Sequence, residues 1–331
     1  MQAYIISKLD LTVKDIAKTI SYDINEDSAT GVSSGFVFAI AMDAGPGDFL
    51  LLRGVYLGVI SGIEGDKKTS IVTIRTLPIS SIFSRNILLG TALAVTENYI
   101  LSAINANFVS SGDTQMDIPF ISAIAKTQTS LSVTPHNDNE IYNLDTFLRY
   151  VAKRHSIFTD YEITADALNV SIEKREPPLH IIDATVADVL SLNEIVVSEC
   201  VSKLMVKTSS SVLTYYLFDG GSFGTNPAAG TRVLGKIETV YCENANDALK
   251  TAGDAFSKNK YSHLIELEVI SSSKLYDTGQ MRLYDKAVVR TKTGIYDTYI
   301  SFKSTKSAAQ TVLIKFGDAR LTLTDKLKGG S

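Results

Sequence analysis

The chain has 331 residues, of which 45% are hydrophobic and 21% charged, a composition typical of folded domains and sufficient for two or three of them. The formal net charge of −4 gives no electrostatic reason for the chain to wrap nucleic acid. Its two cysteines, Cys200 and Cys242, are far apart in sequence, which argues against a disulfide framework and predicts two reduced, small core residues.

Targeting and membrane signals are weak. The N-terminus, MQAYIISKLD, has no basic segment followed by an apolar one, so we predict no secretion signal. The longest clean apolar run, residues 36–42, is far shorter than the about 20 residues that a membrane span needs. We therefore expect no membrane span and a protein that is made and folded in the cytoplasm.

Residues 1–95 are predicted to be mainly β. The apolar run GFVFAIAM (35–42) has strand length, and residues 45–77 contain three strands in succession, with a turn at Gly54 between the first two. The stretch 13–24 is ambiguous. Its apolar residues fit a helix at Val13, Ile16, Ala17 and Ile20, but they fit a strand at Ile20, Tyr22 and Ile24.

Residues 96–180 change character and predict a small α+β insert. Thr96 is a candidate helix cap, followed by an apolar stripe that ends at Phe108. The clearest helical pattern of the chain places apolar residues at positions i, i+3, i+4, i+7 and i+8 from Leu144 to Ala152. The segments FTDYEIT and LNVSIEK predict two short strands, and Pro177 and Pro178 close the insert.

Residues 181–331 return to β. The segments VSKLMVKT and VLTYYLF predict a hairpin, residues 245–256 a helix, and HLIELEVI an alternating strand. The Gly-rich loop DGGSFGTNPAAG (219–230) is expected to be ordered only by a neighbouring protein. A run of strands, broken at Gly279, Gly294 and Gly317, closes the sequence. Because β structure returns after the insert, we expect two related β domains.

Candidate phosphate and metal motifs are incomplete. GDKKTS (65–70) lacks the glycine before the lysine of a phosphate-binding loop, and no strong helix follows GGSFG (220–224). HNDNE (136–140) lacks the glycine and the terminal glutamate of a calcium loop, and SSSK (271–274) lacks the companion motifs of a serine hydrolase. These segments are therefore predicted to be polar turns and loops.

Catalytic pairs are also missing along the sequence. His263 and Glu266 are three positions apart in a predicted strand, so their side chains should point to opposite faces. Carboxylates that meet only in space stay possible, since sequence spacing does not reveal them. We predict no cofactor, no metal site, no catalytic residue and no enzymatic activity.

The order of these features resembles phage tail-hub proteins. In GDFLLLRGVYLGVISGIEGDKKTSIVTIRTLPISSIFSRNILL, a Gly-Asp opens a strand, a hairpin with an apolar-Gly-apolar core follows, and residues 82–85 stand where that family has an LFxR segment. Residues 245–269 then resemble its Ala-rich helix, Tyr-x-His and alternating strand. The C-terminal segment, with YDTYIS and FGDARLTLTDKL, is similar to the terminal barrel of hubs from phages of Gram-positive bacteria. One departure is Tyr284-Asp285, where Gly-Asp is usual in that family.

The resemblance implies a mainly β fold with an α+β insert: a first tube-like β-barrel domain over 1–95, an α+β insert domain over 96–185, and a second β-barrel domain over 186–331 that includes a strand-rich barrel segment. It implies no catalytic residues. It places residues near Arg85 and the hairpin 312–327 at subunit contacts. The candidate interface residues are Phe83, Arg85, Phe223, Phe316, Arg320, Leu321 and Leu323.

The same resemblance implies a structural virion protein of the tail tip or baseplate, assembled in the host bacterial cytoplasm. Three copies with two barrels each would form a homotrimer that joins a sixfold tail tube to a threefold spike or fibre. The implied partners are the tail tube or distal-tail ring protein, a spike, fibre or tail-lysin protein, and the tape-measure protein. DNA would pass through the channel without specific binding, because tight binding needs basic residues that displace counterions.

Three alternatives stay open. The chain could be another tail component, such as a tube protein or a distal-tail ring protein, or the hub of a contractile particle that lacks a genome. It could be a tail-associated cell-wall hydrolase, although no Cys/His pair or zinc cluster is evident. It could also be a carbohydrate- or receptor-binding β module, for which the absence of Trp is unfavourable.

Overall fold

The computed structural model describes residues 1–65, 70–88, 90–91, 93–133, 135, 141–196, 201–218, 222–230, 235–242, 245–257, 259 and 263–317. The chain forms two compact units. The N-terminal unit contains Met1–His180, Ile270–Lys286 and Phe302–Leu313. The C-terminal unit contains Ile181–Val269, Ala287–Ser301 and the segment that begins at Ile314.

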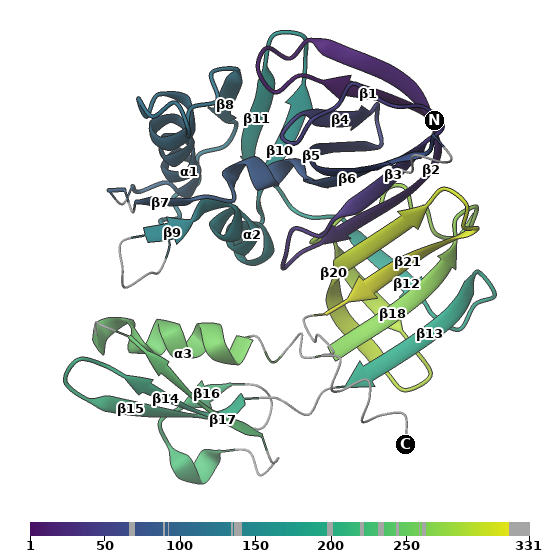
Figure 1. Ribbon diagram of the computed structural model, residues 1–331. Coiled ribbons are helices and arrows are strands. Elements are labelled where there is room, and N and C mark those ends of the chain that lie inside the picture. Colours follow the sequence, from purple (N-terminus) through teal and green to yellow (C-terminus); the bar gives the residue numbers. More distant parts are fainter. Residues whose placement is uncertain are drawn as a thin grey trace. The chain divides into compact units, whose positions relative to one another are not determined.

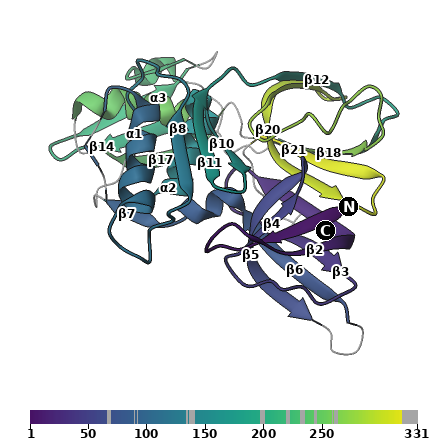
Figure 2. The same cartoon turned by 90° about the horizontal axis from the view of Figure 1, so that it is seen from above.

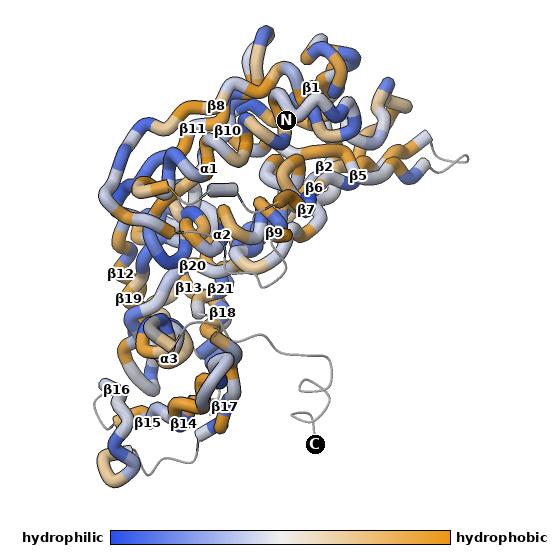
Figure 3. The backbone as a smooth tube through the Cα atoms, turned by 90° about the vertical axis from the view of Figure 1, so that its left-hand side faces the viewer, coloured by the Kyte–Doolittle hydropathy of each residue, from blue (hydrophilic) through white to orange (hydrophobic). Residues whose placement is uncertain are grey.

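A closed antiparallel barrel of six strands begins the N-terminal unit (Figure 1). The strand order is β1-β4-β5-β6-β3-β2, and pairing of β1 with β2 closes the barrel. Hydrophobic and hydrophilic residues alternate along strands such as β5 and β6 (Figure 3), as expected where one face is inside. The strands are β1 (Gln2–Ile6), β2 (Val13–Asp27), β3 (Ser34–Phe38), β4 (Phe49–Leu52), β5 (Tyr56–Gly65) and β6 (Val72–Pro78).

The barrel core follows from this alternation. Gly54 has a φ of 71°, which suits the tight turn between β4 and β5 because glycine adopts positive φ without steric cost. The inward side chains form one apolar cluster, consisting of Ala3, Ile5, Ala17, Ile24, Phe36, Phe38, Leu50, Leu52, Ile60 and Ile74.

Strand β2 does more than close the barrel. It is 15 residues long, so its first part pairs with β1 and its last part, from Asp23 to Asp27, pairs with residues 302–306 of another strand, β20 (Ile295–Lys306). Residues 13–24 are therefore a strand, and the alternative helix is wrong.

An α+β insert follows the barrel in the same unit. Its main sheet has the order β10-β11-β8, with β8 parallel to β11, and helices α1 and α2 lie against one face of this sheet (Figure 2). Its elements are a 3-10 helix (Ile79–Phe83), β7 (Asn86–Leu88), α1 (Thr96–Ile104), a π-helical turn (Asn105–Val109), β8 (Ile121–Ala125), β9 (Ile141–Asn143), α2 (Leu144–His155), β10 (Ile157–Ile163) and β11 (Leu168–Lys174).

Helix α2 has the end signals expected of a stable helix. The side chain of Asn143 accepts a hydrogen bond from the backbone N–H of Thr146 at 3.1 Å, which satisfies one N-terminal donor. Basic residues from Lys153 to His155 occupy the last turn, where they complement the helix dipole. Helix α1 differs from expectation: Thr96 is its first residue and does not cap it, because its hydroxyl donates to the carbonyl of Leu131 at 2.7 Å.

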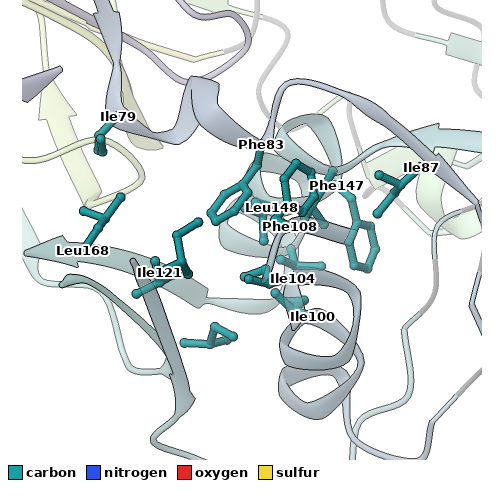
Figure 4. Close-up of a cluster of buried hydrophobic side chains, with 14 of the residues drawn as sticks. Ile79, Phe83, Ile87, Ile100, Ile104, Phe108, Ile121, Phe147, Leu148 and Leu168 are labelled. Atoms are coloured by element: carbon teal, nitrogen blue, oxygen red, sulfur yellow. The ribbon is translucent and has the colours of Figure 1, made fainter. Parts of the chain in front are cut away.

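The insert and the outside of the barrel share a large apolar core (Figure 4). Phe83 and Phe108 pack edge to face with ring centroids 5.0 Å apart, and helices α1 and α2 contribute Ile100, Ile104 and Phe147. Ile6 and Phe49 of the barrel belong to the same cluster, so burial of apolar surface holds the insert against the barrel.

A second run of strands is ordered β13-β18-β21-β20-β19-β12. Some of these strands pass from one unit to the other along the chain. Besides β20, they are β12 (Leu179–Asp183), β13 (Val189–Val196), β18 (His263–Ile270), β19 (Lys286–Arg290) and β21 (Thr311–Phe316).

The C-terminal unit also contains its own α+β body. A four-stranded sheet has the order β16-β15-β14-β17, and α3 covers one of its faces (Figure 1). Its elements are β14 (Val201–Lys207), β15 (Val212–Leu217), β16 (Phe223–Gly224), a 3-10 helix (Pro227–Ala229), β17 (Lys236–Tyr241), a 3-10 helix (Ala245–Asp247) and α3 (Ala248–Ser257). The expected mainly β fold with a small helical part is confirmed, and the sequence did not predict this body as separate from the second β domain.

Candidate assembly surface

The outer face of β2 carries an apolar stripe formed by Val13, Ile16 and Ile20. These side chains are 53%, 46% and 56% exposed, whereas Ala17 and Thr19 between them are buried inside the barrel. A solvent-facing strand position normally carries a polar residue. Exposed apolar side chains that follow one strand indicate a surface that contacts another protein.

The stripe lies on the outer face of the barrel. Strand β2 pairs with β1 along residues 13–18 and with β3 along residues 19–23, so each stripe residue lies in a part of β2 that is held in the barrel. Register shifts, one in the pairing with β1 and one in the pairing with β3, mark irregularities that bend the strand. A partner would therefore contact the side chains of the stripe.

A groove of about 830 Å³ in the N-terminal unit has Val13 in its lining. One wall comes from the barrel and includes Tyr4 and Val55, and the other comes from the end of β10 and includes Ile163. The guanidinium of Arg53 lies 4.6 Å from the centroid of the Tyr4 ring, a cation–π contact. Stripe and groove together form a largely apolar surface, which we call the β2 surface.

Arg149 of helix α2 joins the insert to the barrel through polar contacts. Its Nε is 3.0 Å from Asp145 Oδ2, and its Nη1 donates to the carbonyl of Asp27 at 2.8 Å. Its Nη2 donates to Ser80 Oγ at 3.3 Å. The side chains of Arg149 and Asp145 are only 13% and 10% exposed, so this ion pair is largely shielded from water. Its hydrogen bonds must therefore offset the cost of removing both charges from water.

Tyr284 lies near these contacts of Arg149 and has an unusual backbone conformation. Its φ of 69° is in the left-handed region, which a bulky residue rarely adopts. Such a conformation costs free energy that the contacts of the side chain must offset. Its hydroxyl donates to the carbonyl of Ser28 at 2.9 Å, and burial raises the pKa of Tyr284 to about 12.

Of the predicted interface residues, Phe83 and Arg85 belong to the insert. Phe83 is fully buried in the core that the insert shares with the barrel, so its side chain is not offered to a partner. Arg85 is exposed, but its guanidinium contacts the carbonyl of Gln115 and lies 3.6 Å from Met116 Sδ. Its role at a subunit contact stays a prediction.

The other predicted residues lie in the C-terminal unit. Phe223 is partly buried against Phe256, with ring centroids 5.1 Å apart, and Phe316 is fully buried. Phe223 thus packs within the chain, whereas residues 225–229 are exposed. Residues 219–221 of the loop lie outside the described residues, and its ordering by a neighbouring protein stays a prediction. Arg320, Leu321 and Leu323, like most of the second half of the hairpin 312–327, lie outside the described residues.

Candidate catalytic chemistry does not assemble in the described part of the chain. His263 Nε2 is 2.9 Å from Thr298 Oγ1, while Glu266 pairs with Lys315, so the two residues serve different contacts. Cys242 is buried, and its Sγ accepts a hydrogen bond from Thr251. Within the described ranges, no three His, Cys, Asp or Glu side chains gather as they would around a metal ion. None of the described helices is long and apolar enough to cross a membrane.

Sequence reasoning missed the β2 surface. The spacing of Val13, Ile16 and Ile20 suggested a helix. These residues lie on the outer face of a strand whose inner face is also apolar, so the apolar positions together do not show the simple period of two of a one-sided strand. The signal that could have found this surface is the presence of apolar residues on both faces of one strand, because such a strand is expected to be covered on both faces.

The comparisons with known proteins concern the whole chain. No protein-family model matches the sequence. No curated protein matches it either. Among solved structures, a tail protein from Neisseria meningitidis is similar with a TM-score of 0.58 and 12% identity, over 98% of this chain and 98% of that one.

Two further solved structures agree. A prophage tail protein from Listeria monocytogenes is similar with a TM-score of 0.58 and 12% identity, over 99% of this chain and 98% of that one. A chain of the phage P2 baseplate in its activated conformation has a TM-score of 0.53 and 11% identity, over 96% of this chain and 100% of that one. The chain therefore has the fold of phage tail and baseplate proteins, and the expected resemblance is confirmed at the level of the fold.

Proposed function

We propose that this chain is a structural component of a phage tail or tail-like particle, and that it acts as a tail hub. The observation that carries the proposal is the likeness to phage tail and baseplate proteins, which covers almost all of this chain and of theirs. A likeness that extends over almost the whole chain is more informative than a likeness of one barrel, because single β barrels serve many functions.

In the proposed assembly, three copies form a closed ring. Each chain contributes two β regions, so three chains present six of them to a sixfold tail tube and keep threefold symmetry toward a spike or fibre. Contacts in such a ring are heterologous, which means that two different surfaces of each copy meet. The β2 surface is suited to be one of them, because it is exposed and apolar.

A second candidate contact is the open face of the sheet in the C-terminal unit. Helix α3 covers the other face, and the strand registers place Ile237 opposite Lys203 and Tyr241 opposite Lys207. Ile237 and Tyr241 are 59% and 51% exposed. A face of this composition suits another tail protein, such as the tube, distal-tail, spike or tape-measure protein.

The experiment is the mass of the purified chain in solution, measured by light scattering at several concentrations, with electron microscopy of the same sample. A trimer with a central hole is the expected result. A hexameric ring would favour a tube or distal-tail role. A monomer at every concentration would contradict self-assembly and leave a role that depends on tail partners, to be tested by adding the tube protein.

A further inference from the structure

A cavity of about 300 Å³ lies in the N-terminal unit, where helix α2, strand β10, the end of β2 and residues 283–284 meet. Among the described residues, four buried side-chain N or O atoms lack a hydrogen-bond partner. Three of the four, Asp145 Oδ1, Thr159 Oγ1 and Tyr161 OH, belong to residues that line this one cavity. Buried polar atoms are nearly always paired in folded proteins, so this concentration points to a ligand.

The charges of the lining favour a cation. Glu26, Asp27 and Asp145 supply three carboxyl groups, whereas Arg149 is the one basic residue among the lining residues. Arg149 directs its donors to Asp145 Oδ2, the carbonyl of Asp27 and Ser80 Oγ, so its charge is engaged by the protein. Burial raises the pKa of Glu26, and the nearby Lys303 and Arg282 oppose this rise, so the carboxylate that is open to a ligand is that of Asp145.

The remaining walls combine aliphatic and aromatic residues. The rings of Tyr56, Phe158, Tyr161 and Tyr284 all line the cavity. Aromatic faces attract cations through the ring quadrupole, and they do so more strongly where water is excluded. Asp145 lines the same cavity and is only 7% exposed, so its unpaired oxygen is shielded from bulk water.

We propose that this cavity binds the primary ammonium group of a small organic amine. An ammonium group carries three N–H donors, and the cavity offers three unpaired oxygen acceptors, one of them charged. A calcium ion would need six to eight oxygen ligands with more carboxylates. A neutral polyol would bring no positive charge to the unpaired carboxylate oxygen of Asp145.

The test uses the full chain and 1,4-diaminobutane as the probe, by titration calorimetry in an amine-free phosphate buffer. Saturable binding to one site is expected, with a rise in melting temperature that follows from selective binding to the folded state. Thr159→Val keeps the shape of the side chain and removes one acceptor, so the affinity should fall by about tenfold. Thr239→Val, on β17 in the other unit, is the matched control and should leave the affinity unchanged.

Three results would overturn the proposal. The first is no binding of the diamine to the wild-type chain, or binding that Thr159→Val and Tyr161→Phe both leave unchanged. The second is equally tight binding of tetramethylammonium, which has no N–H donor. The third is competition by glycerol or potassium chloride at the same concentration as the diamine, which would assign the three oxygens to a polyol or an inorganic cation. Melting curves of both variants establish that they fold.

Discussion

Glu26 on β2 and Lys303 on β20 are directly opposite each other in an antiparallel pair. Lys303 Nζ donates to the carbonyl of Met281 at 2.8 Å. We call the pairing of residues 23–27 with residues 302–306 the seam. A second pair of opposite charges in the seam is Asp23 and Lys306, whose Oδ2 and Nζ are 3.7 Å apart. Opposite charges across neighbouring strands favour this register over a shifted one. The seam therefore ties strand β2 to a strand more than 270 residues later in the chain.

The first prediction concerns Glu26. Burial raises the pKa of Glu26 above its ordinary value of 4.5 and lowers the pKa of Lys303 below 10.5. A raised carboxyl pKa contributes stability at low pH that is lost as the pH rises through the folded-state value. Wild type and Glu26→Gln should therefore be similarly stable near pH 4.5, and the variant should be the more stable one at neutral pH, as measured by urea unfolding.

Glu64→Gln provides a control of opposite sign. Glu64 is exposed, and its hydrogen bond and charge interaction with Arg75 lower the pKa of Glu64. A lowered pKa contributes stability that is lost as the pH falls through the folded-state value, so this variant should not gain on the wild type as the pH rises. A variant of Glu26 that is less stable than wild type at neutral pH would contradict the assignment.

The second prediction concerns Tyr284. Tyr284→Phe removes the hydroxyl that donates to the carbonyl of Ser28, which should reduce stability by about 1 kcal/mol. The raised pKa of about 12 means that the wild type loses this contribution as the pH rises through that value. An ultraviolet titration of tyrosinate should show one late-titrating group fewer in the variant. Identical titration curves would exclude a buried phenol at this position.

The third prediction concerns Gly317. Its φ is 87°, and a Cβ at this position would lie 2.0 Å from the backbone oxygen of His263. Gly317→Ala should therefore reduce stability by about 3 kcal/mol or more, because backbone must move. Gly35→Ala is the matched control, since nothing lies within 4 Å of its added Cβ. Equal melting temperatures for the two variants would refute this explanation.

The fourth prediction concerns the β2 surface. Ile16→Lys combined with Ile20→Lys places charges on exposed positions, so the melting temperature of the isolated chain should change little. If the surface joins copies, the same change should dissociate the ring to monomers in light scattering. Lys18→Ser, between the two isoleucines on the same face, should leave the ring intact. Assembly of the double variant would exclude the β2 surface as a subunit contact.

The fifth prediction concerns the joint between the barrel and the insert. Arg149→Met leaves the carboxylate of Asp145 buried without its counter-charge, which should cost about 3–5 kcal/mol. The double variant Asp145→Leu with Arg149→Met removes both charges and should recover much of this loss. Urea unfolding measures both. A double variant less stable than Arg149→Met would show that the pair is not the main source of the effect.

Much of the local structure could be predicted from periodicity. The spacing from Leu144 to Ala152 predicted helix α2, and alternation predicted β10, β11 and β18, because a one-sided core imposes a period on each element. Residues 13–24 could not be assigned in this way. Their apolar side chains serve both the barrel interior and the β2 surface, so the pattern contains two faces at once.

The sequence by itself determined the mainly β class, several helices and strands such as α2, β10, β11 and β18, and the resemblance to tail proteins, because these depend on local patterns. Only the tertiary structure decided which distant residues meet. The cavity joins Glu26, Asp145, Thr159 and Tyr284, and the seam joins Glu26 to Lys303. Such contacts depend on pairing between strands that are hundreds of residues apart in sequence and on a core to which several elements contribute. Neither can be read from a local sequence pattern.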